Sequence, residues 1–312
     1  MPSPVRAATF AAILLATNVF AADAFVNTDV FELEVAANPQ ISPDGSRIAY
    51  TRRSMDIMTD RPVSNVWVID ADGSDHRPLL SGPQGFSGQT WSPSGDRIAY
   101  VTRVEGRGPQ IHVMWMDSGR SGALTNLRHA PSNLAWSPDG KWIAFSMFVP
   151  AESRSLATPP AKPEGAEWAP PVTVIESVQY RGDGRGYLDP GNTQIFVLSA
   201  DGGTPRQLTS GAFNHGGRLQ WTPDGKAIVF AANRQDEWIY DPVEAELWSV
   251  DVATAEATQL TDRNGPDFAP AISPDGSKIA YLGFDDEGMG NHSVQVYVMD
   301  RRSGEIDVLA RD

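Results

Sequence analysis

A short turn motif recurs five times in this chain and constrains its fold more than any other feature. Each copy has the form Ser/Thr-Pro-Asp/Ser-Gly, and a strand-like run such as Ile-Ala-Tyr begins three residues after its glycine. Proline fixes φ at the second turn position, and glycine relieves strain at the fourth. The motif therefore predicts a tight hairpin turn between two strands. Its five copies begin at Ser42, Ser92, Ser137, Thr222 and Ser273.

Each repeat contains enough apolar runs for four short strands. One strand precedes the turn, one follows it, and a third and a fourth come after that; the third strands are predicted at 66–70, 111–115, 195–198, 247–251 and 296–300. The clearest fourth strands are 206–209 and 258–261. Three of the four intervals between motifs are 50, 45 and 51 residues, which matches one propeller blade. The sequence thus predicts an all-β fold, a β-propeller with five recognisable four-stranded blades, rather than a β-sandwich.

A large apolar side chain ends the first strand of every repeat. We expect these side chains to fill the space between neighbouring blades. They are Ile41, Trp91, Trp136, Trp221 and Ile272.

The one long interval, 85 residues, contains an insertion at about 148–191 within the third blade. It begins Pro-rich, continues with a strand-like run at 172–175 and ends in a Gly-rich stretch at 180–189. Loops of this length are usually functional or disordered. A sixth blade hidden in this interval is the alternative interpretation.

The N-terminus has the features of a secretory signal peptide. Arg6 precedes a short apolar run, and small residues follow it, so residues 1–22 are the expected signal with cleavage near Ala21–Ala24. A buried N-terminal helix is the alternative. Residues 23–37 then lead into blades at 38–312, and the expected location is periplasmic or secreted, with no membrane span.

Charge and cysteine content exclude several classes of function. The formal net charge is −14, which argues against binding to nucleic acid or to an anionic membrane surface. The chain has no cysteine, which excludes disulfides, Cys-ligated zinc and thiol nucleophiles.

No motif of enzymatic chemistry is present. The sequence lacks the Gly-x-Ser-x-Gly turn of α/β-hydrolases, the His-Glu-x-x-His motif of zincins and a phosphate-binding Gly-x-x-x-x-Gly-Lys loop. We therefore predict no catalytic, cofactor-binding or metal-binding residue in this chain.

A few polar residues still allow weaker hypotheses. His112 lies in a predicted strand and is expected to pack or to face solvent. His215 precedes a predicted inner strand, so it is a candidate for the central channel. The acidic run 285–287 is expected in a solvated hairpin loop, with a calcium site as the alternative. Arg181 and Arg185 are candidates for an acidic substrate or partner domain, with solvated arginines as the alternative, and Arg181-Gly182-Asp183 is interpreted as a glycine turn rather than an adhesion motif.

The chain resembles the N-terminal propeller of the prolyl oligopeptidase family of serine peptidases, in the branch of acylaminoacyl peptidases and secreted dipeptidyl peptidases. The turn motif alone is not specific, because TolB-like propellers share it. The resemblance rests on an ordered set of segments: Asp29-Val30-Phe31-Glu32-Leu33, the Gly-rich 180–189, Trp238-Ile239-Tyr240-Asp241-Pro242, 260–267 and 281–286.

The resemblance implies a larger assembly than this chain supplies. Members of the family carry a seven-bladed propeller followed by an α/β-hydrolase domain with a Ser-Asp-His triad, and the propeller restricts access to it. The five blades are then expected to be part of such a propeller, without the last blades and the hydrolase, and no family catalytic residue can be transferred to this sequence. The expected partners are a peptide substrate or that hydrolase domain. The alternative is a stand-alone, TolB-like periplasmic propeller that binds a protein or peptide.

Overall fold

The computed structural model describes residues 25–151, 160–169 and 174–310. The expected signal peptide lies outside the described residues, as does most of the Pro-rich start of the insertion. A short 3-10 helix, η1 (Asn27–Phe31), precedes the first strand. No helix in the described part of the chain has the length and hydrophobicity that crossing a membrane requires.

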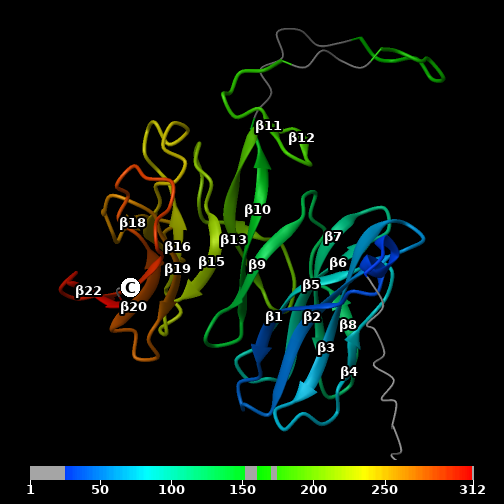
Figure 1. Ribbon diagram of the computed structural model, residues 1–312, viewed down its shortest axis with the longest axis horizontal. Coiled ribbons are helices and arrows are strands. Elements are labelled where there is room, and N and C mark those ends of the chain that lie inside the picture. Colours follow the sequence, from blue (N-terminus) through cyan, green and yellow to red (C-terminus); the bar gives the residue numbers. More distant parts are fainter. Residues whose placement is uncertain (1–24, 152–159, 170–173, 311–312) are drawn as a thin grey trace, which may run out of the picture.

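Five four-stranded antiparallel sheets follow one another along the chain (Figure 1). The first contains β1 (Val35–Ile41), β2 (Arg47–Asp56), β3 (Arg61–Asp70) and β4 (Arg77–Leu80). The second contains β5 (Phe86–Trp91), β6 (Arg97–Val104), β7 (Gly108–Trp115) and β8 (Ser121–Ala123). The third contains β9 (Pro131–Trp136), β10 (Trp142–Pro150), β13 (Gly191–Ser199) and β14 (Arg206–Gln207). The fourth contains β15 (Gly216–Trp221), β16 (Ala227–Ala232), β17 (Glu246–Asp251) and β18 (Ala257–Gln259), and the fifth contains β19 (Asp267–Ile272), β20 (Lys278–Gly283), β21 (Gln295–Asp300) and β22 (Ile306–Ala310).

The recurring motif forms the predicted turn between the first and second strands of every sheet. In the first sheet, the Ser42 hydroxyl donates to Asp44 at 2.6 Å and accepts from the Arg47 backbone N–H at 2.9 Å. Gly45 has a φ of +72°, a conformation that disfavours other residues. The second sheet has serine in place of the aspartate, and Asp96 accepts the Ser92 hydroxyl instead, at 2.8 Å. The side-chain network is therefore kept where serine replaces the aspartate of the motif.

Tryptophans join neighbouring sheets, as predicted. Trp91, Trp136 and Trp221 are each 8% exposed. Each indole N–H donates to a backbone carbonyl of the preceding sheet, at 3.0–3.1 Å, and the acceptors are Gln40, Thr90 and Ala135. Each seam thus combines apolar burial with one hydrogen bond, because a buried indole N–H needs an acceptor.

The expectation for Ile41 was wrong. Its side chain is 67% exposed, although it occupies the position of the buried tryptophans. The reason is that, among the described residues, no sheet packs against this side of the first sheet. Ile272, at the same position of the fifth sheet, does pack against the fourth.

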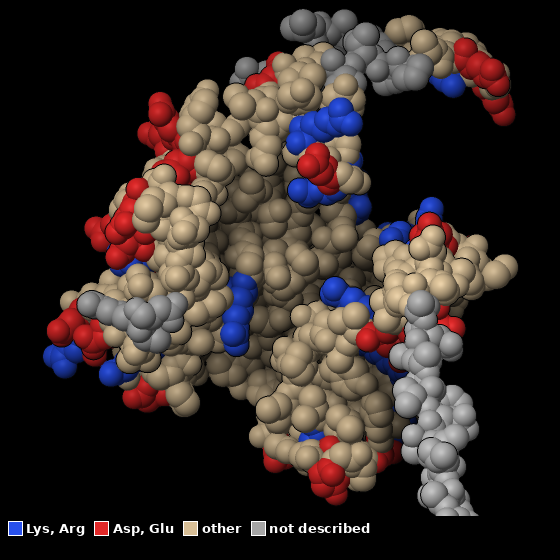
Figure 2. Space-filling model, viewed as in Figure 1, with Lys and Arg blue, Asp and Glu red and all other residues tan. Residues whose placement is uncertain are grey.

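The five sheets form an open arc. The apolar clusters join the first sheet to the second, the second to the third, the third to the fourth and the fourth to the fifth, and none of those in the described residues joins the fifth to the first. Figure 2 shows a hollow between the two ends of the arc. Acidic side chains gather at the left edge of this view, over the fourth and fifth sheets, whereas the wall of the hollow is mostly uncharged.

The insertion leaves the third sheet at the end of β10 and returns at the start of β13. The regular structure among its described residues is a small hairpin, β11 (Arg181–Gly182) paired with β12 (Gly186–Tyr187). This hairpin lies beyond the end of β10 at the top of Figure 1. The tripeptide Arg181-Gly182-Asp183 therefore belongs to a glycine-containing turn, as interpreted. The strand expected at 172–175 is not confirmed: residues 172–173 lie outside the described residues, and Val174 and Ile175 are exposed and outside any strand.

Candidate functional site

A hydrogen-bonded glutamine–threonine pair recurs where the second strand of a sheet gives way to the third. We call this the upper side of the arc. In the second sheet, the Thr125 hydroxyl donates to Gln110 Oε1 at 2.9 Å and accepts from the Ile111 N–H. In the third sheet, Thr209 and Gln194 form the same pair at 2.8 Å. Both threonines follow the observed fourth strands, β8 and β14. The strand predicted at 206–209 ends at Gln207 instead, because the Thr209 hydroxyl replaces the next backbone acceptor for the Ile195 N–H.

The amide groups of the two glutamines also donate hydrogen bonds to backbone carbonyls. The fourth sheet has no glutamine at this position. Gln110 Nε2 donates to the Leu127 carbonyl at 3.0 Å, and Gln194 Nε2 to the Gly211 carbonyl at 3.1 Å. The fourth sheet has Glu246 at this position, which accepts the Thr261 hydroxyl at 2.5 Å. Glu246 is only 7% exposed, and burial raises its pKa to about 8. At neutral pH the side chain is therefore mostly a neutral acid, which can donate as glutamine does.

Two further buried carboxyl groups lie close to Glu246. Asp267, at the start of β19, is fully buried, and burial raises its pKa although Arg263 donates to it at 2.6 Å and 3.1 Å. Glu244 is 5% exposed, and burial raises its pKa as well. Its Oε2 accepts from the Gly265 N–H at 2.9 Å, whereas its Oε1 has no partner. The boundary between the fourth and fifth sheets thus carries three buried acids, Glu244, Glu246 and Asp267, whose pKa values are raised by burial.

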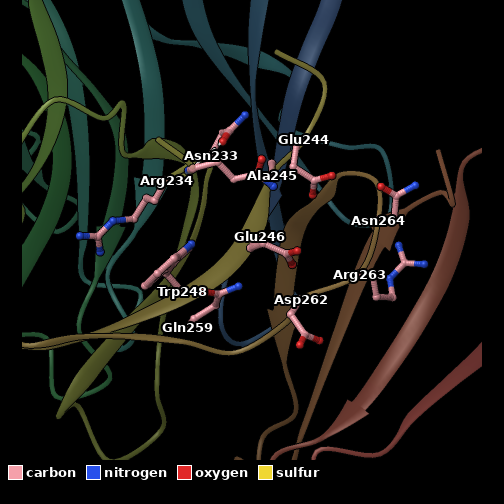
Figure 3. A pocket seen from close by; sticks show the side chains of 11 residues that line it. Asn233, Arg234, Glu244, Ala245, Glu246, Trp248, Gln259, Asp262, Arg263 and Asn264 are labelled. Atoms are coloured by element: carbon pink, nitrogen blue, oxygen red, sulfur yellow. Dashed lines mark hydrogen bonds between the residues drawn. The ribbon is translucent and has the colours of Figure 1, made fainter. Parts of the chain in front are cut away.

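Glu244 and Glu246 line a cavity of about 370 Å³, which we call the acidic pocket (Figure 3). The loop between β16 and β17 forms one wall, and the connection from β18 to β19 forms another. Figure 3 shows Glu244, Glu246, Asp262, Arg263 and Asn264 arranged around it. The sequence motifs did not predict this pocket. The available signal was the constant spacing of fifteen residues between Gln110 or Gln194 and its threonine, which Glu246 and Thr261 repeat.

Replacing Glu246 by glutamine should stabilise the protein in a pH-dependent way. The folded pKa lies above the usual carboxyl value of 4.5, so the stability contributed by the proton is present below pH 4.5 and is lost as pH rises towards about 8. Glutamine removes this loss. We expect the stability difference between Glu246→Gln and the wild type to grow between pH 5 and 8 and to reach about 1–2 kcal/mol at pH 9.

Urea denaturation at pH 5, 7 and 9 measures this difference. Glu256→Gln is the matched control, because Glu256 is exposed on the turn between β17 and β18. A Glu246→Gln variant that follows the pH profile of the control would contradict the protonated state that we assign to Glu246.

A second and larger cavity, of about 750 Å³, lies between the insertion and the third and fourth sheets. We call it the insertion pocket. Tyr180 and Tyr187 of the β11–β12 hairpin line it, with ring centroids 6.2 Å apart, and Trp238 from the β16–β17 loop lies at its margin. Asn214 also lines the pocket, and its side chain accepts the Thr193 N–H at 2.9 Å. The pocket therefore combines aromatic surface with amide groups.

The two candidate histidines, His112 and His215, are packing residues. His112 lies in β7 against the Tyr100 ring, at 5.6 Å, as expected for a packed residue. His215 does not face a channel: it is fully buried, its Nδ1 lies 2.9 Å from Gln194 Oε1, and its ring meets Phe230 edge-on. Burial lowers the His215 pKa to about 4, which keeps the ring neutral.

The remaining candidates from the sequence are charged residues: the acidic run 285–287, Arg181 and Arg185. Asp285 lies in the expected loop between β20 and β21 and pairs with Arg263 at 2.5 Å, while Asp286 lies 3.3 Å from His292. Among the described residues, no three His, Asp or Glu side chains are grouped so that they could hold a metal ion. Arg185 lines the insertion pocket, whereas Arg181 is exposed on the hairpin and does not line it.

Comparison with known proteins supports the resemblance found in the sequence. Residues 167–275 match the family model of the dipeptidyl peptidase IV N-terminal region. The chain is 29% identical to the uncharacterized peptidase YuxL of Bacillus subtilis over 66% of its own length and 30% of the length of YuxL. It is 22% identical to dipeptidyl-peptidase 5 of Porphyromonas endodontalis over 83% of its own length and 38% of that protein. The matches therefore span about a third of these relatives.

Solved propellers share the fold. An acylaminoacyl peptidase of Pyrococcus horikoshii superposes with a TM-score of 0.64 at 14% identity, over 89% of this chain and 40% of that one. TolB of Acinetobacter baumannii superposes with a TM-score of 0.53 at 16% identity, over 89% of this chain and 69% of that one. In sequence and in fold, the chain is thus a β-propeller similar to the N-terminal propeller of the prolyl oligopeptidase family of serine peptidases.

Proposed function

We propose that this chain is the non-catalytic propeller portion of a secreted serine peptidase of the prolyl oligopeptidase family. In this proposal the propeller gates the access of peptides to a hydrolase domain that is not among the 312 residues of the chain. The observation that carries the proposal is the position of the family match. Residues 167–275 include the β11–β12 hairpin and Trp238, and they contain every residue that lines the insertion pocket except Phe148.

The chemistry of the insertion pocket suits a peptide. Its volume lies in the range of ligand-binding pockets, which combine apolar and aromatic walls with a few polar groups. Asn192 and Asn214 can hydrogen-bond to a peptide backbone, and Tyr180, Tyr187 and Trp238 can pack against apolar side chains. On this proposal, the insertion is a contact surface for peptides on the upper side of the propeller.

A short apolar peptide should bind at this pocket. We expect titration calorimetry with N-acetyl-Ala-Phe-Ala amide to detect binding, and Trp238→Ala to weaken it by about tenfold, because buried aromatic contacts dominate such interfaces. Tyr240→Ala is the matched control: Tyr240 lies two residues away and is 73% exposed outside the pocket. Equal affinities of the two variants would rule out the insertion pocket as the peptide site.

The link to a hydrolase domain has a separate test. An antibody raised against the propeller should detect, in the organism, a polypeptide about twice as long as this chain, since the matched relatives are of that size. A fluorophosphonate probe, which reacts with activated serine, should label the same band. A band that contains the propeller and has the mass of this chain alone, 33.8 kDa or slightly less, would refute the proposal.

That outcome would favour a stand-alone, TolB-like propeller that binds a protein or peptide. The observation behind this second candidate is the share of each solved structure that the chain matches. It matches 69% of the Acinetobacter TolB but only 40% of the acylaminoacyl peptidase. Both candidates imply a periplasmic or secreted location, in agreement with the signal peptide expected at residues 1–22.

A further inference from the structure

The acidic pocket contains a buried polar atom without a partner. Glu244 is 5% exposed and lines the cavity, and its Oε1 accepts no hydrogen bond. Buried polar atoms are nearly always paired in folded proteins, so an exception that borders a cavity indicates a missing partner. A carboxylate oxygen accepts hydrogen bonds, so that partner must be a donor.

The cations nearby are already engaged elsewhere. Arg263 donates to Asp267 and Asp285, and its guanidinium lies 3.8 Å from the centre of the Tyr297 ring. Arg234 stacks on Trp248, at 4.4 Å from the ring centre. Neither arginine forms an ion pair with Glu244 or Glu246 in the described structure. In the described structure, the two carboxyl groups of the pocket are therefore not paired with either of the arginines that line it.

We propose that the acidic pocket binds a guanidinium group, with Glu244 and Glu246 as its hydrogen-bond acceptors. A guanidinium presents several N–H donors in a planar fork, which matches carboxylate oxygens better than the point charge of an ammonium does. A metal ion fits less well, because the described residues contain no group of three His, Asp or Glu side chains placed to hold one. The cavity volume of about 370 Å³ is in the range of small-molecule sites.

This proposal does not depend on the peptidase assignment, and it can be tested with a separate pair of small ligands. N-acetyl-arginine amide carries its only charge on the guanidinium, and N-acetyl-citrulline amide is its neutral isostere. Titration calorimetry at pH 9 should detect binding of the arginine compound, with at least tenfold weaker binding of the citrulline compound. Equal binding of the two compounds, or no binding of either, would overturn the proposal.

The affinity should also depend on pH. The charged and titratable groups that face Glu246 are Glu244, Asp262, Arg263, Asp267 and, across Trp248, Arg234. Burial among these groups raises the Glu246 pKa to about 8, so binding of a cation must displace a proton at lower pH. We expect about tenfold weaker binding at pH 7 than at pH 9, and a pH-independent affinity would exclude Glu246 as an acceptor.

Variants separate binding from folding. Glu244→Gln and Glu246→Gln should each weaken the arginine compound at least tenfold at pH 9, whereas Glu256→Gln should leave its affinity unchanged. Glu246→Gln is informative because it should stabilise the fold, so its loss of binding cannot come from unfolding. Unchanged affinity in both pocket variants would refute the site.

The same titration identifies the source of the guanidinium. N-acetyl-Ala-Arg-Ala amide presents it as a peptide side chain, and methylguanidine, whose only charge is the guanidinium, presents it as a free small molecule. Tighter binding of the peptide than of N-acetyl-arginine amide would assign the pocket to a side chain of a peptide or protein. Tighter binding of methylguanidine would assign it to a free metabolite, and both results support guanidinium recognition.

Discussion

Replacing Trp221 by alanine should lower the free energy of unfolding by about 3–5 kcal/mol, the usual cost of truncating a large buried aromatic side chain. Trp221 is 8% exposed between the third and fourth sheets, and its indole N–H donates to the Ala135 carbonyl at 3.0 Å. Alanine would leave a cavity at the seam and an unpaired carbonyl. Urea denaturation followed by circular dichroism measures the loss.

Trp142→Ala is the matched control for this experiment. Trp142 begins β10 of the third sheet, the sheet that accepts the hydrogen bond of Trp221, and it is 42% exposed. We expect it to cost at most about 1 kcal/mol, because little apolar surface is buried there. Trp221→Phe should fall between the two, since it keeps most of the packing but loses the hydrogen bond. Equal losses for Trp142→Ala and Trp221→Ala would show that the seam does not hold the sheets together.

Replacing Arg263 by alanine should cost a comparable amount, about 3–5 kcal/mol, for an electrostatic reason. Asp267 is fully buried, and one of its oxygens already has no partner. Without the two hydrogen bonds from Arg263, its carboxyl group would be buried and unpaired at the start of β19. Denaturation at pH 7 measures the loss.

Two further variants test this explanation. Arg77→Ala removes an exposed ion pair with Asp75, in which the two side chains are 46% and 51% exposed, and it should cost less than about 1 kcal/mol. The double variant Arg263→Ala/Asp267→Asn removes the buried charge together with its partner, so it should recover part of the loss. A double variant as unstable as the sum of its single variants would contradict a role for the buried charge.

Local rules were sufficient to predict the blades. Turn chemistry and alternation are encoded within a few residues, so the motif at Ser42 and its four repeats located the hairpins, and the tryptophans located the seams. The exposed Ile41 could not be predicted this way, because its environment depends on whether another sheet lies beside it. The absence of a strand at Val174 and Ile175 has the same origin: β-branched residues favour a strand only where a partner strand is present.

The acidic pocket was harder to predict because it depends on contacts between distant residues. The pKa of Glu246 is raised chiefly by burial and further by nearby acids, one of which, Asp267, lies in a different sheet. Its relation to Gln110 and Gln194 was present in the sequence as a spacing. A spacing, however, does not reveal that the amides of Gln110 and Gln194 donate to backbone carbonyls. A glutamate at this position can do so only when it is protonated.

The tryptophan seams have a consequence for the order in which the protein is built. Trp91, Trp136 and Trp221 each reach back to a carbonyl that precedes them in the chain, never forward. During synthesis the acceptor of every seam has therefore left the ribosome before its donor does. We expect each new blade to dock on one that is already in place, so that assembly follows translation from the N-terminus, as it does for whole domains.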